Sequence, residues 1–480
     1  MMRIAILICL LPAALAQAAP PCGWRGDGSG WVEQFEWSAP AGPKPPVLWR
    51  TELPDRTTAS PVVAGNRLFT MVEPHWLYCL DAPSGKILWQ REINVLDLLP
   101  PDQVAPAKQL FAKTWAATNE LRRKGKEAPD ELQAEVKKLW ADLRPHGLYQ
   151  TEWLENGFTS ATPVTDGQFV YVKLGTGIAA CFDLDGNLKW KVPWPAFVRD
   201  QELCVQSPLL ADGKLIFTWN PPAKATGEPE HCNESLLALD PATGRELWRS
   251  SDFVRTPGWL CATPALMRLG NTTVAITGGG VFRLSDGKLL ASKVCFTGSA
   301  SSPVVRDDIV YALDMESHTM SKKPENCNEK GSRFYAVKLA LAAPDKVQAT
   351  ELWRVELKAD RCFPTPIVTT DHVYIWNTSH KLLTLRRQTG QLLSERRLKL
   401  AKGWNYSSAV LGGQTLFLPA SSGQLAIAEA APQGKILATW DLLPFSTDGW
   451  LGEQMAASPL LHNHRLYLRT GKALYCLGQP

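Results

Sequence analysis

The chain lacks the features that mark several large classes of protein. No stretch beyond its first twenty residues reaches the roughly 18 apolar residues of a membrane-spanning helix. Basic and acidic residues nearly cancel, with 51 Lys plus Arg against 47 Asp plus Glu and no basic run, so nothing favours nucleic acid as a partner. Charged residues make up only 20% of the chain and hydrophobic residues 45%, which excludes a disordered protein.

The short motifs of common enzyme classes are missing as well. There is no phosphate-binding loop, no Gly-x-Ser-x-Gly nucleophile motif and no His-Glu-x-x-His zinc motif. None of the 11 Cys residues is adjacent to another. The sequence therefore predicts no catalytic residue and no metal ligands.

The amino terminus is typical of an export signal. Arg3 precedes an apolar run at residues 4–11, and small residues at 14, 16 and 18 offer a cleavage site. We expect residues 1–18 to be a signal peptide and 19–46 to form a leader before the main domain. The mature protein is predicted to be exported to the periplasm or secreted, where disulfides are possible.

A repeated unit divides the rest of the chain. Each copy opens with a Ser or Thr anchor, usually followed by Pro, and continues as four short β-runs separated by polar turns, a pattern typical of one propeller blade. The units average about 47 residues, near the length of known propeller repeats. The eight anchors are Ser60-Pro61, Thr162-Pro163, Ser207-Pro208, Thr263-Pro264, Ser302-Pro303, Thr365-Pro366, Ser408-Ala409 and Ser458-Pro459. The fourth run of most units closes with a Trp: Trp89, Trp190, Trp248, Trp353 and Trp440.

The two ends of the repeat region complement each other. The eighth unit stops at Leu477 after three runs, and residues 47–52 supply the missing fourth. Closing the ring in this way leaves no exposed sheet edge between the termini. We therefore predict an all-β fold over 47–478: an eight-bladed β-propeller of four-stranded blades closed by an N-terminal strand. Two amphipathic stretches predict a helical hairpin insertion at about 100–146.

The unit Ser-Pro-Val-Val…Leu-Tyr-Cys-Leu-Asp…Gly-Lys…Leu-Trp resembles the repeat of PQQ-repeat (quinoprotein-like) β-propellers. The leader segment Gly23-Trp24-Arg25-Gly26-Asp27 looks like the start of exported bacterial members. The resemblance includes PQQ-dependent alcohol dehydrogenases and non-catalytic propellers similar to an outer-membrane assembly factor. A dehydrogenase would carry adjacent cysteines and a calcium site, and the chain has no Cys-Cys pair. We therefore expect no cofactor, with PQQ and calcium required only if the chain is a divergent oxidoreductase.

The topology of the blades predicts where a site lies. The hairpin, the segment 220–232 and the segment 315–332 all leave the ring on the same face, and loops displayed by a rigid scaffold often carry function. On this face we expect a ligand- or partner-binding surface that includes Trp259, Trp404, Trp450, Glu202 and Glu453. Inter-blade packing of the Trp residues and solvated carboxylates are the alternatives. The hairpin itself is either a lid packed on the ring or a docking element.

The cysteines fall into two groups. Cys79, Cys181 and Cys476 occupy a third-run position that other units fill with Ala, which predicts small buried side chains. A disulfide or a thiol is predicted at each of Cys204, Cys232, Cys261, Cys327 and Cys362. The sequence does not determine how they pair.

These observations predict a binding or scaffold module in the bacterial periplasm or cell envelope. Its partner is expected to be an envelope protein, or a small-molecule or glycan ligand, on the face that carries the long loops. The alternatives are a divergent PQQ-dependent oxidoreductase and a carbohydrate-active propeller.

Overall fold

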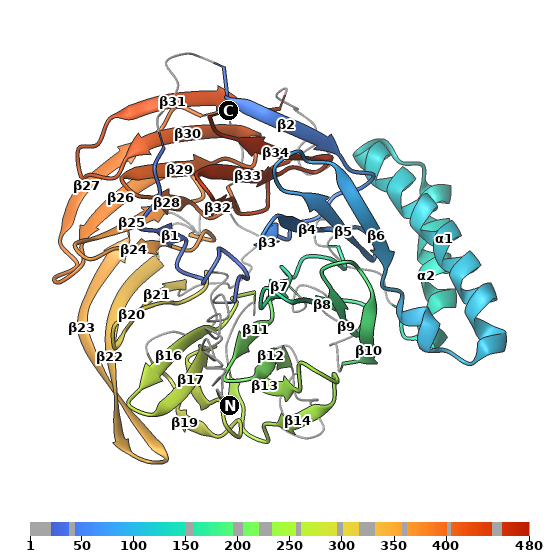
Figure 1. Ribbon diagram of the computed structural model, residues 1–480, viewed down its shortest axis with the longest axis horizontal. Coiled ribbons are helices and arrows are strands. Elements are labelled where there is room, and N and C mark those ends of the chain that lie inside the picture. Colours follow the sequence, from blue (N-terminus) through green and yellow to red (C-terminus); the bar gives the residue numbers. More distant parts are fainter. Residues whose placement is uncertain are drawn as a thin grey trace, which may run out of the picture.

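Eight antiparallel sheets are arranged in a ring, as Figure 1 shows, in a computed structural model. The structure describes residues 21–37, 44–148, 157–194, 205–219, 233–255, 261–294, 301–315, 332–357, 362–400, 405–443 and 454–479. Within each sheet the strands follow one another outward from the axis of the ring, so each sheet is one propeller blade. The predicted eight-bladed propeller is confirmed.

Blades 1 to 4 use the strands β3 to β19. Blade 1 has β3 (Val62–Ala64), β4 (Arg67–Val72), β5 (Trp76–Asp81) and β6 (Ile87–Glu92). Blade 2 has β7 (Val164–Thr165), β8 (Phe169–Leu174), β9 (Ile178–Asp183) and β10 (Leu188–Pro193). Blade 3 has β11 (Leu209–Ala211), β12 (Lys214–Trp219), β13 (Asn233–Leu239) and β14 (Glu246–Arg249), with β15 (Val254–Arg255) also paired to β13. Blade 4 has β16 (Ala265–Leu269), β17 (Thr272–Thr277), β18 (Gly280–Arg283) and β19 (Leu289–Ala291).

Blades 5 to 8 complete the ring. Blade 5 has β20 (Val304–Arg306), β21 (Ile309–Met315), β22 (Ser332–Ala343) and β23 (Lys346–Leu357). Blade 6 has β24 (Ile367–Val368), β25 (His372–Trp376), β26 (Lys381–Arg386) and β27 (Leu392–Arg397). Blade 7 has β28 (Val410–Gly412), β29 (Thr415–Pro419), β30 (Gln424–Glu429) and β31 (Ile436–Asp441), with β1 (Trp31–Val32) added beside β28. Blade 8 has β32 (Leu460–His462), β33 (Arg465–Arg469), β34 (Ala473–Leu477) and β2 (Val47–Glu52), which confirms the predicted closing strand.

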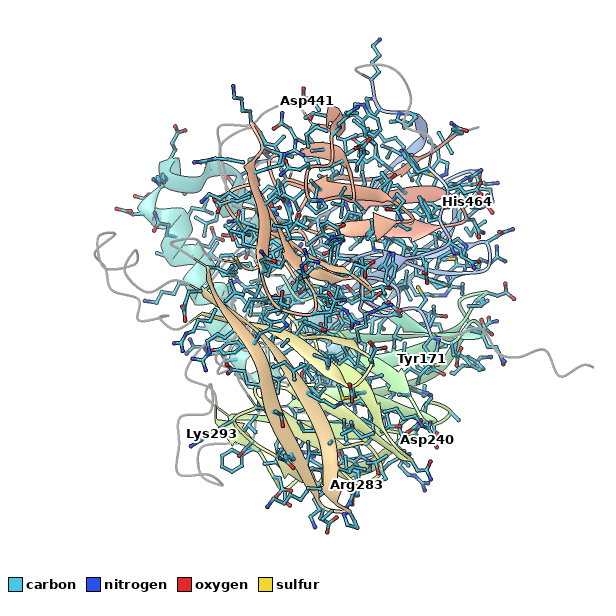
Figure 2. All side chains as sticks on the ribbon, turned by 90° about the vertical axis from the view of Figure 1, so that its left-hand side faces the viewer. Tyr171, Asp240, Arg283, Lys293, Asp441 and His464 are labelled. Carbon is cyan, nitrogen blue, oxygen red and sulfur yellow. The ribbon has the colours of Figure 1, made fainter. Side chains whose placement is uncertain are left out.

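The alternating strand directions give the ring two different faces. The turns between first and second strands and between third and fourth strands, including Asp240 and His464, lie on one face, which we call the turn face (Figure 2). The blade-to-blade connections and the second-to-third connections lie on the other, the loop face, where Figure 2 labels Lys293. The helical hairpin belongs to a blade-to-blade connection and therefore to the loop face.

The anchor residues join neighbouring blades around the axis. The backbone N–H of Ser60 donates to the hydroxyl of Thr162 at 3.0 Å, and each later anchor up to Ser408 donates to the hydroxyl of the next. The remaining bonds of this series are Ser207 to Thr263, Thr263 to Ser302, Ser302 to Thr365 and Thr365 to Ser408, all at 2.9–3.1 Å. Within the part of the chain that the structure describes, the buried Ser60 hydroxyl has no hydrogen-bond partner, so the series is interrupted between blades 8 and 1.

Closing Trp residues dock several blades on the next one. Trp89 lies opposite Cys79 in its own sheet, and its indole N–H donates to the carbonyl of Leu184 in blade 2 at 3.0 Å. A Cβ on Gly186 would lie 2.8 Å from the Trp89 ring, so the turn requires glycine there. The same contacts recur for Trp49 with Cys476 and Ala82, Trp190 with Cys181 and Pro241, and Trp353 with Ala336 and Arg387. The predicted small buried cysteines are confirmed, because each makes room for an indole.

Blades 4, 6 and 7 depart from this arrangement, and in blade 6 the docking position holds Ser394. In blade 7 Trp440 lies opposite Leu425, two residues beyond the docking position, which Ala438 occupies; the prediction of Trp440 as an equivalent closing Trp is therefore wrong. Blade 4 has Ala291 at the docking position, and the preceding Leu290 packs with Val347 from the long β22–β23 hairpin of blade 5. In blade 5 this hairpin replaces the tight turn that an indole contacts in other blades. A Trp of blade 4 would therefore have no such turn to dock on.

The predicted helical hairpin is also confirmed. It contains η1 (Val95–Leu98), α1 (Pro101–Lys124), η2 (Gly125–Glu127), α2 (Asp130–Leu143) and η3 (Arg144–His146). Phe111 of α1 stacks on His75 at the end of blade 1, and Lys108 pairs with Glu92 at 3.2 Å and with Asp97 at 2.6 Å. The hairpin is thus fixed against blade 1. None of the helices among the described residues combines the length and apolarity needed to cross a membrane.

Candidate functional site

The leader residues 21–37 cross the axis of the ring on the turn face. At one end Cys22 and Thr165 exchange two backbone hydrogen bonds of 2.9 Å, which attaches the leader to blade 2. At the other end Trp31 and Val32 form β1, which pairs in parallel with β28 of blade 7 (Figure 1). Between them the backbone folds through glycines with positive φ at Gly26, Gly28 and Gly30, a conformation that other residues rarely adopt.

Arg25 fixes the leader to blades 6 and 7. Its guanidinium donates to the carbonyl of Pro366 at 3.1 Å and to the carbonyl of Ala409 at 2.9 Å, and the side chain is 3% exposed. Both acceptors directly follow anchor residues, so the guanidinium reaches the hydroxyl series near the axis. Burial lowers the pKa of Arg25 to about 9, although the charge of Asp27 opposes this shift. Gly30 is required here, because a Cβ would lie 2.2 Å from the guanidinium.

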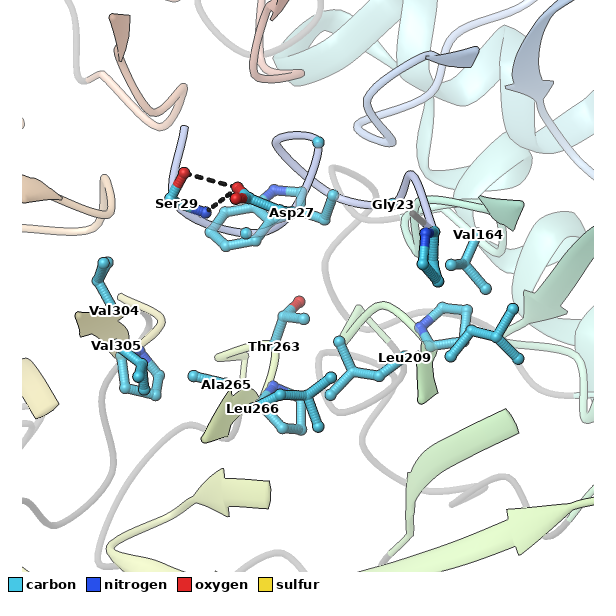
Figure 3. Close-up of a pocket in the computed structure, with 18 residues that line it drawn as sticks. Gly23, Asp27, Ser29, Val164, Leu209, Thr263, Ala265, Leu266, Val304 and Val305 are labelled. Carbon is cyan, nitrogen blue, oxygen red and sulfur yellow. Dashed lines mark hydrogen bonds between the residues drawn. The ribbon is translucent and has the colours of Figure 1, made fainter. Parts of the chain in front are cut away.

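On the other side of the leader lies a pocket of about 290 Å³, which we call the axial pocket (Figure 3). Its wall on the ring side comes from the inner strands of blades 2 to 5 and consists almost entirely of aliphatic and prolyl side chains. The residues of this wall are Val164, Pro208, Leu209, Leu210, Thr263, Pro264, Ala265, Leu266, Pro303, Val304 and Val305. Four blades therefore contribute to one apolar surface.

The leader forms the opposite, more polar wall. Trp24 and Asp27 line the pocket together with Pro21, three glycines and Ser29. The Oδ1 atom of Asp27 accepts hydrogen bonds from the Ser29 N–H at 2.9 Å and the Ser29 hydroxyl at 2.6 Å, drawn as dashed lines in Figure 3. Asp27 is exposed and is the one charged side chain among the described residues that line the pocket. The arrangement suits binding of an apolar group beside a carboxylate better than acid–base chemistry, which requires a positioned proton donor or acceptor.

A buried charged cluster lies in blades 2 to 4, which also contribute to the pocket wall. Glu234 of blade 3 is 2% exposed and accepts a hydrogen bond from the Thr277 hydroxyl of blade 4 at 2.5 Å. Burial raises the pKa of Glu234 to about 7, while Thr277 and the positive charge of Lys173 oppose the shift. The Lys173 ammonium of blade 2 lies 4.7 Å from the centre of the Trp194 ring. The cluster thus connects three neighbouring blades.

A second polar cluster joins the hairpin to the junction of blades 8 and 1. The carboxylate of Asp55, just after the closing strand, accepts hydrogen bonds from Trp115 and Asn119 of α1, each at 3.2 Å. The Asp55 carbonyl accepts one from the buried Arg469 of blade 8 at 2.7 Å. Arg122 lies over the Trp115 ring at 4.6 Å. The hairpin therefore reinforces the place where the ring closes.

Glu73 completes this junction. Its carboxylate is 3% exposed and accepts hydrogen bonds from the N–H groups of Phe158 and Thr159 at 3.0 and 2.8 Å and from the Thr159 hydroxyl at 2.5 Å. Burial raises the pKa of Glu73, while these hydrogen bonds and the charge of Arg122 oppose the shift. Its oxygens are occupied by contacts that hold the connection entering blade 2.

Most of the predicted site residues lie outside the described residues, so the structure does not test them. These residues are Trp259, Trp404, Trp450, Glu202, Glu453, Cys204, Cys232 and Cys327. Cys261 is half-buried where the chain enters blade 4, and Cys362 is buried where it enters blade 6. No disulfide joins two of the described cysteines. The axial pocket is on the turn face, and its position was not predicted, because nothing in the pattern around Trp24 and Asp27 shows which strands they meet.

The donors needed for PQQ with calcium do not come together in the described residues. No group of three or more His, Cys, Asp or Glu side chains is found among them. Glu234, which follows Asn233, resembles part of such a donor set, but its carboxylate is bonded to Thr277 and lies near the Lys173 charge. None of the described residues that line the axial pocket is a cation that could pair with the carboxylates of PQQ. The described residues therefore supply no complete donor set for calcium.

Comparison with known proteins identifies the family. The family model described as "Outer membrane protein assembly factor BamB" matches residues 45–99 and 233–470, which is more than half of the chain. The chain belongs to this PQQ-repeat β-propeller family. Among curated proteins, no sequence matches this chain.

Solved structures show the same fold at low sequence identity. BamB from Moraxella catarrhalis is 12% identical, with a TM-score of 0.53 over 90% of this chain and 99% of that chain. The computationally designed Ika8 protein is 9% identical, with a TM-score of 0.51 over 91% of this chain and 100% of that chain. A quinohemoprotein alcohol dehydrogenase from Comamonas testosteroni is 11% identical, with a TM-score of 0.45 over 96% of this chain and 81% of that chain. At these identities, similarity to BamB and Ika8 concerns the fold alone.

Proposed function

We propose that this PQQ-repeat propeller is a non-catalytic binding or scaffold module, exported to the bacterial periplasm or cell envelope, whose partner is an envelope protein. The proposal rests on what the buried charged side chains contact. Arg25, Glu73, Glu234 and Arg469 each contact a neighbouring blade or connection and do not converge on one site. The family description as an assembly factor agrees with a role in holding other proteins.

The loop face is the proposed docking surface, and the helical hairpin is its best-defined part. The inward side of the hairpin is fixed by Asp55, Lys108 and Phe111, so its outward side is presented rigidly. On that outward side Lys137 and Lys138 of α2 are exposed. Exposed Glu135 and Asp142 of the same helix accompany these lysines, so the surface presents both charge signs in a fixed pattern, which favours selective association with a complementary partner.

The test is crosslinking in cells followed by purification of the full chain under denaturing conditions. The wild-type protein is expected to capture a reproducible envelope protein, and Lys137→Glu with Lys138→Glu is expected to reduce the yield several-fold. A matched control reverses the exposed Lys86 and Lys435, which lie in tight turns on the turn face. Unchanged capture by the hairpin variant would reject the hairpin as the docking element, and absence of any specific partner would reject the scaffold function.

A calorimetric titration with PQQ in the presence of Ca²⁺ separates this proposal from an oxidoreductase. We expect no binding, because the described residues lack the donor set and the chain lacks a Cys-Cys pair. Tight, calcium-dependent binding would overturn the non-catalytic proposal. A glycan array without a hit would likewise exclude a carbohydrate-binding propeller.

A further inference from the structure

The axial pocket has the size and the wall of a site for one small organic group. Its volume of about 290 Å³ is near the lower end of the range for small-molecule sites, roughly 300–1,000 Å³. Val164, Leu209, Leu266 and Val305 from four separate blades contribute to its apolar wall. Burying an aromatic ring or a branched aliphatic chain against this wall is favourable, because apolar surface is removed from water.

The leader wall determines the charge of the ligand. Of the lining residues that the structure describes, Asp27 is the one with a charge, and its Oδ1 atom accepts two hydrogen bonds from Ser29. Among the described residues no donor contacts its Oδ2 atom, which is available to a ligand. Trp24 lines the same wall, and the Arg25 guanidinium lies 5.4 Å from the centre of its ring, so this ring already has a cation partner. Arg25 donates its hydrogen bonds to Pro366 and Ala409, so its guanidinium is not bonded to Oδ2 of Asp27.

We propose that the axial pocket binds a primary ammonium that carries an apolar side chain. The apolar part lies against the inner strands of blades 2 to 5, and the ammonium bonds to Oδ2 of Asp27. Since Asp27 is exposed, the ammonium keeps part of its hydration and avoids the desolvation cost of a buried ion pair. Two sources have this chemistry: the amino-terminal residue of a peptide, such as Leu or Phe, and a free alkyl or arylalkyl amine.

This proposal goes beyond the scaffold function and does not depend on it. The pocket is on the turn face, whereas the proposed protein partner binds the loop face. Failure to capture a partner in cells would therefore not contradict the proposed amine site. Failure of the amine titration would not contradict the proposed partner.

The test titrates the full mature chain with 2-phenylethylamine and with 2-phenylethanol, followed by calorimetry and ligand-observed NMR. The two probes share the ring and differ in the charged group. We expect the amine to bind about fivefold more tightly, as an exposed ion pair allows. A second pair, Phe-Gly-Gly and N-acetyl-Phe-Gly-Gly, distinguishes the sources. Binding of the free peptide indicates a peptide amino terminus, and binding of the amine alone indicates a small amine.

Substitutions locate the binding. Asp27→Asn keeps an oxygen for the Ser29 hydrogen bonds and is expected to weaken amine binding about fivefold while leaving the alcohol unchanged. Leu266→Trp and Val305→Phe each fill the pocket and are expected to abolish binding of all probes. Asp185→Asn, in a tight turn of blade 2 on the same face, is the matched control and is expected to bind like the wild type. Thermal unfolding of each variant confirms that it is folded.

Three results would overturn the proposal. The first is absence of saturable binding by any probe, and the second is equal affinity for the amine and the alcohol in the wild-type protein. The third is amine binding that survives both Asp27→Asn and the two pocket-filling substitutions. Because Asp27→Asn is conservative and exposed, the proposal remains falsifiable even if a pocket-filling variant does not fold.

Discussion

The two sides of the leader meet the ring in different ways. Toward blades 6 and 7 the buried guanidinium of Arg25 is bonded to two backbone carbonyls. Toward blades 2 to 5 the leader meets aliphatic side chains across a pocket, and the charged groups lie deeper in the blades, at Lys173 and Glu234. The same segment therefore fastens the ring on one side and forms the wall of a site on the other.

This difference shows how a pseudo-symmetric ring acquires one distinct site. Eight similar inner strands alone would present similar surfaces around the axis. Attachment of the leader at Thr165 and at β28 breaks the symmetry, and Arg25 fills one side only. The position of the pocket is thus determined by where the leader is attached and not by the repeat.

The largest expected effect concerns the pocket side and its dependence on pH. Glu234 has a pKa of about 7 in the folded protein against an ordinary value of 4.5, so the folded state keeps a proton that the unfolded state has lost between these values. The free energy of unfolding therefore falls as pH rises from about 4.5 to about 7, by roughly 3 kcal/mol in total. Glu234→Gln is expected to remove this fall.

Urea unfolding of both proteins from pH 5 to pH 8 measures the effect, and exposed Glu356→Gln serves as the control. If the wild-type protein and Glu234→Gln show parallel curves, Glu234 does not titrate as described. Arg25 stays charged throughout this range, since its pKa is about 9, so the Arg25 side is expected to add no slope.

The next effect concerns the Arg25 side. Arg25→Ala leaves the carbonyls of Pro366 and Ala409 without their donors, and unpaired buried acceptors cost more than the removed desolvation of the cation returns. We expect a loss of about 2 kcal/mol in the free energy of unfolding, measured in urea. Arg268→Ala, at an exposed position in blade 4, is expected to change it by less than about 0.5 kcal/mol. Equal stability of both variants would show that Arg25 does not fasten the leader.

The sequence predicts the ring but does not show the axial pocket. The anchors, the closing Trp residues and the strand at 47–52 repeat at regular spacing, and this regularity predicts blade number, closure and the faces of the loops. The axial pocket depends on contacts that no local pattern encodes. Arg25, for example, meets Pro366 across 341 residues of the chain.

The departures from the repeat likewise depend on contacts that no local pattern encodes. Trp440 lies two residues beyond the docking position because its strand pairs Ala438 with Ile427, a register that the Leu-Trp pattern alone does not show. Blade 4 has Ala291 at the docking position, where the long hairpin at Val347 covers the preceding Leu290. In both cases the decisive neighbour is far away in the sequence or is set by strand register.

The smallest expected effect comes from comparing a hydroxyl within the series, Ser207, with the hydroxyl at its interruption, Ser60. Ser207 accepts a hydrogen bond from the buried N–H of Thr162 at 3.0 Å, so Ser207→Ala leaves this N–H unpaired and is expected to cost about 1 kcal/mol in urea unfolding. Ser60→Ala is the matched control, because the Ser60 hydroxyl has no hydrogen-bond partner in the described part of the chain, and we expect a change below about 0.5 kcal/mol. An equal loss in both variants would show that the Ser60 hydroxyl is bonded in solution. The hydroxyl series would then be continuous through the junction of blades 8 and 1, where the hairpin also docks.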